Sequence, residues 1–262
     1  MEERRVAVRV AYNGKEFHGS QWQPDLKTVE GEILNALKKI EGQDSKWYRL
    51  KSSSRTDSGV SAVSNVMAFY TSIKNSDGLL RALNANSKDV YFWACSDIPK
   101  NRNVRHALYR RYRYILPSEG LDVDALKKGA SLFIGTHDFR HFCKKDGRGT
   151  VATVTDIDVH DENEFLIIDL TAPYFLWNMA RRIVAAMEQV ARGKAEQSEI
   201  LSALKGKAAY FGVADPHGLI LMDVSYHDLI FRKFDDPVLH RKAAVKRFEK
   251  RTEEEILQAI WQ

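Results

Sequence analysis

The chain has 262 residues, 44% hydrophobic and 29% charged, a composition typical of soluble globular proteins. Its net charge of +5 hints at a polyanionic partner, although a solvated surface with excess lysine explains the total more simply. It has no run of 18 apolar residues, a charged N-terminus and only two cysteines, far apart. We therefore expect no membrane span, signal peptide or disulfide framework, in a cytoplasmic protein.

The N-terminal part of the chain predicts four strands and two helices. Strands are expected at 5–12, 46–51, 65–71 and 90–96. Thr28 is the expected N-cap of a helix, and 77–85 predicts a second helix. The apolar stripe of the first helix is Val29, Ile33, Leu37 and Ile40. Small residues and a glycine predict a loop over 52–62.

The C-terminal part predicts further strands at 111–116, 151–160, 164–172 and 219–226. Helices are expected at 123–133, 174–192, 199–204 and 237–260, the last of them highly charged. The helix at 174–192 is the most strongly amphipathic, and Gly193 is its expected stop. Its apolar stripe is Phe175, Met179, Ile183, Ala186 and Val190.

Strands in hairpin-like pairs with interspersed helices favour an α+β fold with a largely antiparallel sheet over a doubly wound parallel sheet. No low-complexity linker is present, and the segment 99–104 is the best boundary. We therefore expect two halves, 1–104 and 105–262. No short-period repeat is visible.

The loop 54–60 is the first candidate for chemistry. Asp57 lies there among small residues, and Gly59 permits close approach of a ligand to the backbone. An aspartate that only hydrogen-bonds its own turn is the simpler interpretation of this loop taken alone.

A basic segment with interleaved tyrosines is the second candidate. Residues 100–113 contain six arginines and lysines and no acid, an arrangement suited to phosphate contacts and base stacking on RNA. Along the strand, Tyr112 and Tyr114 share one face, whereas Arg111 and Arg113 share the other. Core packing explains Tyr114, but for Tyr112 the pattern does not separate core packing from base stacking.

Two further segments complete the candidates. Arg181 and Arg182 lie in an otherwise apolar stretch of the predicted helix. Such an arginine usually reaches solvent, and if it points inward it needs a carboxylate such as Asp57. The segment 214–219 is interpreted as a plain loop leading into a strand.

Metal and cofactor motifs are weak or absent. His137, His141 and Cys143 are closely spaced, but the segment is not helical in pattern and has no further ligands, so no metal site is predicted. No phosphate-binding glycine motif occurs, which argues against a nucleotide cofactor. No serine-hydrolase signature is present.

Taken in order, these segments resemble the TruA family of tRNA pseudouridine synthases over nearly the whole chain. The matching segments are the N-terminal signature at 11–19 and 23–30, the R-T-D-x-G-V loop at 55–60, the R-Y-x-Y strand at 111–114, the F-x-x-x-M-x-R segment at 175–181, and weaker matches at 137–139 and 214–219. Departures from the family pattern are Ser20-Gln21 before Trp22-Gln23, Ser61 and Ala185. They leave the chemistry intact and leave room for an altered choice of target uridine.

The resemblance implies two α+β halves, ferredoxin-like, whose strands join in a central sheet with an active-site cleft between them. It implies a cofactor-free isomerase, a homodimer, that converts uridine to pseudouridine at positions 38, 39 and 40 in the anticodon stem-loop of tRNA. Asp57 is then the nucleophile, attacking uracil C6 or ribose C1′. Arg181 would pair with Asp57, and Tyr112 would stack on the uracil and assist proton removal from C5.

The remaining arginines are expected to bind RNA. Arg55 would help to extrude the nucleotide and hold a phosphate. Arg105 and Arg111, in the basic segment, would contact the RNA backbone. Two alternatives remain: a non-catalytic RNA-binding module, which leaves the R-T-D-x-G-V loop unexplained, and a synthase of the same fold with other target uridines.

Overall fold

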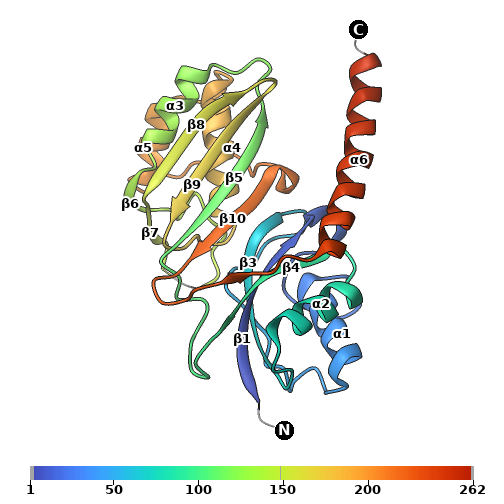
Figure 1. The fold of residues 1–262 in the computed structure, drawn as a ribbon. Coiled ribbons are helices and arrows are strands. Elements are labelled where there is room, and N and C mark those ends of the chain that lie inside the picture. The colour runs from blue at the N-terminus through green and yellow to red at the C-terminus, as the bar shows by residue number, and fades with distance from the viewer. Residues whose placement is uncertain (1–2, 148, 261–262) are drawn as a thin grey trace.

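The computed structural model describes residues 3–147 and 149–260. Its main feature is a nine-stranded sheet in the order β11-β4-β1-β3-β10-β5-β9-β8, with β2 paired to β3 (Figure 1). The strands of this sheet are β1 (Arg4–Tyr12), β2 (Lys51–Ser52), β3 (Ser61–Thr71), β4 (Val90–Asp97), β5 (Tyr109–Pro117), β8 (Asp156–Glu162), β9 (Phe165–Ala172), β10 (Leu219–Ser225) and β11 (Arg232–Lys233). A separate hairpin pairs β6 (Gly135–Asp138) with β7 (Val151–Val154).

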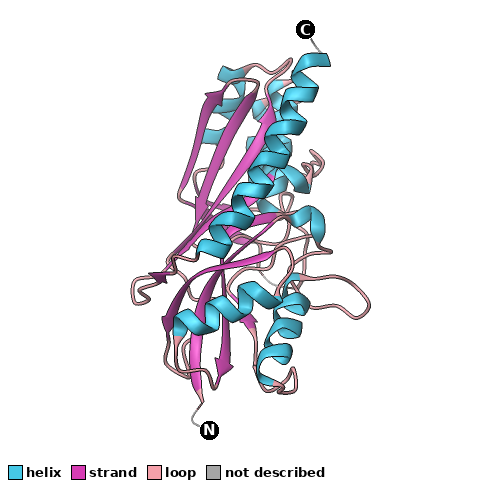
Figure 2. Cartoon of the chain, turned by 45° about the vertical axis from the view of Figure 1, so that its right-hand side comes forward, coloured by secondary structure: helices cyan, strands magenta, loops and turns pink. Residues whose placement is uncertain are grey.

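Six α-helices lie in the part of the chain that the structure describes. They are α1 (Val29–Glu41), α2 (Ser76–Asn86), α3 (Val123–Ser131), α4 (Met179–Ala191), α5 (Gln197–Leu204) and α6 (Pro237–Ile260). Figure 2 shows the strands running as one layer along the length of the molecule, with helices beside them. The predicted α+β class with a mainly antiparallel sheet is confirmed.

The two groups of strands meet where β10 pairs with β3. This is the one parallel pairing among the strands described, and it aligns Ile220 with Ser61 and Leu221 with Ala62. Because parallel strands begin at the same end of a sheet, the segment before β10 and the loop before β3 are brought side by side. The pairing thus places the loop of Asp57 next to the segment 214–218.

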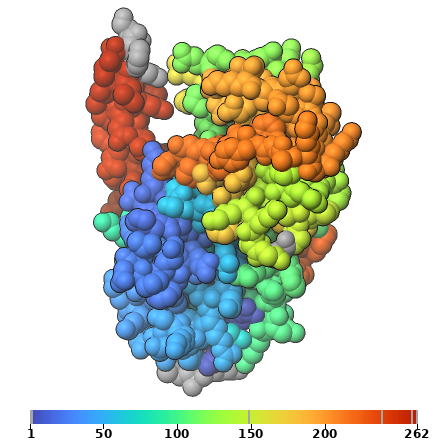
Figure 3. All heavy atoms as spheres, turned by 180° about the vertical axis from the view of Figure 1, so that it is seen from behind, coloured from blue at the N-terminus to red at the C-terminus, as the bar shows by residue number. Residues whose placement is uncertain are grey.

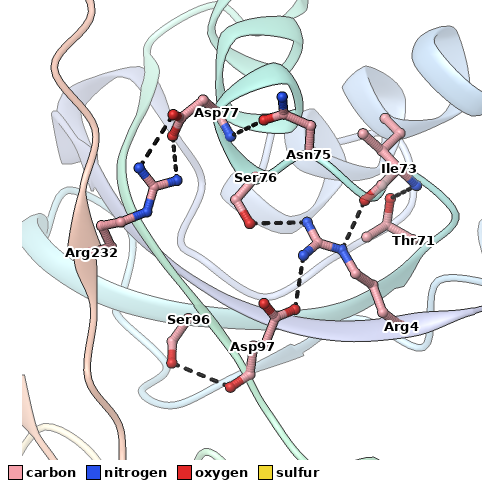
Figure 4. A network of polar contacts seen from close by, with 9 residues as sticks. All are labelled: Arg4, Thr71, Ile73, Asn75, Ser76, Asp77, Ser96, Asp97 and Arg232. Atoms are coloured by element: carbon pink, nitrogen blue, oxygen red, sulfur yellow. Dashed lines mark hydrogen bonds and ion pairs between the residues drawn. The ribbon is translucent and has the colours of Figure 1, made fainter.

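The C-terminal segment returns to the first group of strands. β11 pairs with β4, and Arg232 forms an ion pair with Asp77 at the start of α2 (Figure 4). On the same side, Arg4 of β1 binds Asp97 of β4 at 2.9 Å. After β11, α6 extends away from the sheet (Figure 1). Lys242 near the start of α6 donates to the carbonyl of Asn84 at 2.9 Å.

Most predicted elements are present, and the sequence signals explain them. Thr28 caps α1 by accepting a hydrogen bond from the Gly31 amide, as expected for a threonine N-cap. The predicted stripe residues Met179 and Ile183 of α4 are completely buried. None of the described helices is long and apolar enough to cross a membrane.

Three predicted elements were wrong in part. The strand expected at 46–51 is reduced to Lys51–Ser52, because the chain turns at Arg49, whose φ is 46°. The strand expected at 151–160 is two strands, β7 and β8, which pair with different partners. The helix expected at 174–192 begins only at Met179, because Asn178 adopts a left-handed conformation with φ 62°.

Candidate active site

A cleft of about 820 Å³ lies between the two groups of strands. Its walls come from four segments of the chain, 18–23, 53–60, 105–112 and 174–181, and from Asp146 and Leu219. In the space-filling view the yellow-green and orange segments of the second group lie directly against the blue and cyan segments of the first (Figure 3). Asp57 lines this cleft together with four of the five arginines and tyrosines predicted to act with it: Arg55, Arg105, Tyr112 and Arg181.

The loop of Asp57 is fixed by its neighbour Thr56. The Thr56 amide donates to Ser20 Oγ at 2.8 Å, and the Ser20 amide donates to the Thr56 carbonyl at 3.0 Å. The Thr56 hydroxyl lies 2.8 Å from the Tyr12 hydroxyl, which also accepts from Asn65. All four residues are buried. Burial raises the pKa of Tyr12 to about 12, so this phenol is neutral and serves as a hydrogen-bonding partner at physiological pH.

Two glycines of the N-terminal segment allow that segment to approach the loop. A Cβ on Gly14 would lie 2.3 Å from the carbonyl carbon of Val60 and 2.4 Å from Gly59. Gly19 has a φ of 93°, and a Cβ there would lie 3.2 Å from the Thr56 carbonyl oxygen. Side chains at these positions would push the loop out of place. The glycines in the segment 11–19, which resembles the family's N-terminal signature, are therefore needed to keep Asp57 in position.

The Arg181 guanidinium faces Asp57. Its Nη1 lies 3.2 Å from Asp57 Oδ2, with 15% of the arginine side chain and 30% of the aspartate side chain exposed. Nε of the same group donates to the Ala214 carbonyl at 2.8 Å, and the Ala214 amide donates to the Arg181 carbonyl at 3.2 Å. The segment 214–218, interpreted from sequence as a plain loop, therefore holds the arginine that faces Asp57.

Trp177 is a second donor to Asp57, and it was not among the residues predicted from the sequence. Nε1 of Trp177 lies 3.2 Å from Asp57 Oδ1, so each carboxylate oxygen has one N–H donor. Trp177 lies in the loop between β9 and α4, and Lys144 Nζ sits 4.0 Å from the centre of its ring. The helix predicted over 174–192 would place residues 177 and 181 on one face. This spacing was the signal in the sequence that Trp177 lies near Arg181.

Tyr112 forms part of the inner wall of the cleft. Its side chain is 7% exposed and its ring packs edge-on against Phe175, with the ring centres 5.0 Å apart. Burial is the main cause that raises the pKa of Tyr112 well above its usual value, and the neighbouring Tyr12 and Asp57 raise it further. The residue is therefore a neutral phenol that presents an aromatic surface close to Asp57.

Arg110 is a second residue of the cleft that was not predicted from the sequence to act there. It is 7% exposed and lines the cleft. Its guanidinium donates to Ser54 Oγ at 3.2 Å and to the carbonyls of Ser53, Arg105 and Pro173 at 3.2, 2.7 and 2.5 Å. It thus ties the loop of Asp57 to the second group of strands. Desolvation lowers its pKa.

The other predicted arginines differ in position. Arg55 is exposed and lines the cleft, as does Arg105. Arg111 lies outside the cleft, because alternate residues of β5 face opposite sides of the sheet and Tyr112 faces the cleft. A role for Arg111 in binding RNA stays a prediction, and it concerns the opposite face of the sheet.

The weak metal candidate gains no ligands from the fold. His137 Nε2 lies 3.0 Å from the Ile134 carbonyl, and His141 Nε2 lies 3.3 Å from the Gly206 carbonyl. Cys143 is a buried free thiol. Within residues 3–147 and 149–260, no group of three histidine, cysteine or acidic side chains is arranged to hold a metal ion.

Comparison with known proteins identifies the family. Residues 130–227 match the sequence family described as tRNA pseudouridine synthase. The tRNA pseudouridine synthase A of Pyrococcus abyssi is 40% identical over 98% of this chain and 95% of its own length. The enzymes of the same name from Pyrococcus furiosus and Archaeoglobus fulgidus are 38% and 36% identical, covering 87% and 97% of this chain and 86% and 92% of their own lengths. The family expected from the motifs is thereby confirmed: this chain belongs to the tRNA pseudouridine synthase A family, whose members are isomerases.

Proposed function

We propose that this protein converts uridines in the anticodon stem-loop of tRNA, at positions 38, 39 and 40, to pseudouridine, with Asp57 as the nucleophile. The observation that carries the proposal is the carboxylate of Asp57, which lies in a cleft of about 820 Å³ between the guanidinium of Arg181 and the indole of Trp177. The family membership supplies the reaction class, and the R-T-D-x-G-V match supplies the choice of aspartate.

The chemistry requires few groups. The C1′–N1 bond of uridine breaks, the uracil turns, a C1′–C5 bond forms, and C5 loses a proton while N1 gains one. Neither a redox change nor a phosphate transfer occurs, so the reaction itself calls for no cofactor. A nucleophilic carboxylate can attack uracil C6 or ribose C1′ and carry the intermediate. Arg181, fixed by Ala214, would hold that carboxylate in one orientation.

Tyr112 is suited to hold the detached base. Its ring is rigidly packed, and its raised pKa keeps the phenol protonated at neutral pH. We therefore assign the ring to packing against uracil, with the hydroxyl as a hydrogen-bonding group and not as an anionic base.

The RNA must open for this cleft to work. A base stacked in a stem cannot reach a buried carboxylate unless its nucleotide turns out of the helix. Arg55, exposed at the cleft, is placed to contact the phosphate of a nucleotide turned out in this way, and Arg105 would add a second contact. We further propose that the protein acts as a cytoplasmic homodimer, that residues 1–104 supply the nucleophile, and that residues 105–262 supply Tyr112 and Arg181.

Asp57→Asn tests the proposal. The amide is nearly isosteric but far less nucleophilic, so pseudouridine formation should fall below detection. Because the Arg181 pair is partly exposed, losing it should cost about 0.2–1 kcal/mol, or roughly 1–4 °C in Tm. The assay is tritium release from tRNA labelled at uridine C5, beside a gel-shift assay and a thermal melt.

Normal tritium release by Asp57→Asn would remove this aspartate from the mechanism. Sequencing of the pseudouridines formed in the wild-type reaction tests the target positions separately: products outside 38–40 would refute the anticodon assignment and leave the reaction class intact. Retained RNA binding with lost turnover is the expected result.

A further inference from the structure

Asp57 has two hydrogen-bond donors, and they differ in how firmly they are held. Arg181 is braced through Ala214 and is 15% exposed. Trp177 is 42% exposed and lies in the loop that precedes α4. Of the two donors, the indole is the one with room to move away from the carboxylate.

The chain around Trp177 supports such a movement. The next residue, Asn178, has a φ of 62°, so the helix does not continue back through Trp177. The Asn178 side chain makes no cap hydrogen bond to α4. The ring is in contact with an exposed lysine, because Lys144 Nζ lies 4.0 Å from its centre. The Lys144 amide donates to the Trp177 carbonyl at 2.8 Å, a contact that holds the backbone of Trp177 and not its side chain. A stacked lysine keeps one face of the indole covered while leaving the side chain substantially exposed.

A hydrogen bond on each carboxylate oxygen restrains a nucleophile. Both donors stabilise the negative charge, and the stabilised anion attacks carbon less readily. If Oδ1 is to attack, the Trp177 N–H must leave it. The loss of that hydrogen bond is offset when the indole makes a new interaction elsewhere. Exposed aromatic rings in RNA-binding clefts find such partners in bases, which stack on them irrespective of sequence.

We propose that Trp177 changes partner when RNA enters the cleft: its indole N–H releases Oδ1 of Asp57, and its ring stacks on the base adjacent to the target uridine. The two aromatic residues then divide the work. Tyr112, 7% exposed in the inner wall, receives the uracil, whereas Trp177 at the open side receives its neighbour. Lys144, stacked on the indole, lies beside the backbone of that neighbour. This inference rests on the proposed function, because it takes Asp57 as the nucleophile.

Binding measurements with a stem-loop RNA test the exchange. Trp177→Ala should weaken binding roughly 5- to 150-fold, the range for loss of one base–aromatic stack. Trp177→Phe should recover most of that loss, because phenylalanine keeps an aromatic face and lacks only the N–H. The matched control is Trp47→Phe, since Trp47 is partly buried against Tyr48 outside the cleft. Thermal melts of all three variants should stay near wild type.

A second perturbation, on the RNA, identifies the partner. An abasic nucleotide is placed next to the target uridine, first on one side and then on the other. On the side where the base stacks on Trp177, the abasic RNA should bind the wild-type protein more weakly but should cause no further loss of affinity in Trp177→Ala. Intrinsic fluorescence should fall on RNA binding in the wild type and in Trp47→Phe, and the fall should shrink in Trp177→Phe.

Three results would overturn the inference. The first is wild-type affinity of Trp177→Ala for the RNA, and the second is a loss of affinity from Trp177→Ala that adds to the loss from the abasic nucleotide on both sides of the target. The third is binding by Trp177→Phe that is as weak as binding by Trp177→Ala. Tritium release by the wild-type protein is measured in the same experiment. If wild type releases tritium, any of these three results counts against Trp177 alone, whereas absent release would count against the proposed function itself.

Discussion

Replacing Arg181 with alanine should harm catalysis far more than folding. The substitution removes a hydrogen bond to the Ala214 carbonyl, worth about 1 kcal/mol, and a partly exposed ion pair with Asp57, worth about 0.2–1 kcal/mol. The total of about 1–2 kcal/mol corresponds to a fall of roughly 2–8 °C in Tm. By contrast, Arg181 holds the reacting carboxylate in one orientation, and misplacement of a reacting group by about 1 Å can lower the rate roughly 100-fold.

The assay is single-turnover tritium release at saturating enzyme, so that weaker RNA binding does not enter the rate. Arg181→Lys should recover only part of the rate, because an ammonium cannot reproduce the fork that reaches both Ala214 and Asp57. Arg182→Ala is the matched control: this neighbour lies over the ring of Tyr210 and outside the cleft, so its removal should leave the rate within a few-fold. A fully active Arg181→Ala enzyme would refute the assignment, as would an Arg182→Ala enzyme equally slow.

Three further outcomes are expected. Gly14→Ala, whose Cβ would lie 2.3 Å from Val60, should lower both Tm and tritium release, whereas Gly78→Ala, which meets only ordinary contacts in α2, should change neither. Because burial raises the pKa of Tyr12 to about 12, its contribution to stability is full below its usual pKa near 10 and is lost as pH rises from about 10 to about 12; in melts over that range, the stability advantage over Tyr12→Phe should shrink. RNA affinity should fall steeply with salt, Arg105→Ala should reduce the log–log slope by about one, and chelators should leave turnover unchanged; zinc-dependent recovery after chelation would contradict a metal-free mechanism.

Local signals in the sequence were enough for elements whose residues decide their own structure. α1 begins at its threonine cap, and α6 has the bounds expected from its charge pattern. The predicted strand at 46–51 failed because Tyr48 is buried and its hydroxyl donates to the Leu37 carbonyl in α1. A tertiary contact there overrides the β propensity of Trp47 and Tyr48.

Contacts between distant segments had no comparable signal. The parallel pairing of β3 with β10 joins residues near 61 to residues near 220. The residues of neither segment predict that it pairs with the other. The role of Ala214 depends on that pairing, which is why its segment was interpreted as a plain loop. Arg110 is a different kind of miss: it shares its strand face with Tyr112, so the period of two already placed it on the buried side.

The position of Asp57 is set largely by residues that never touch it. Ser20 fixes the backbone of Thr56, and Tyr12 fixes the Thr56 side chain. Gly14 leaves room for the loop to pass. Arg110 then ties the start of the loop to the other group of strands. Since these contacts come from both groups, a shift of one group against the other would move the carboxylate relative to Arg181. Misplacement of about 1 Å can cost roughly 100-fold in rate, so variants in this supporting layer should lose turnover before they lose their fold.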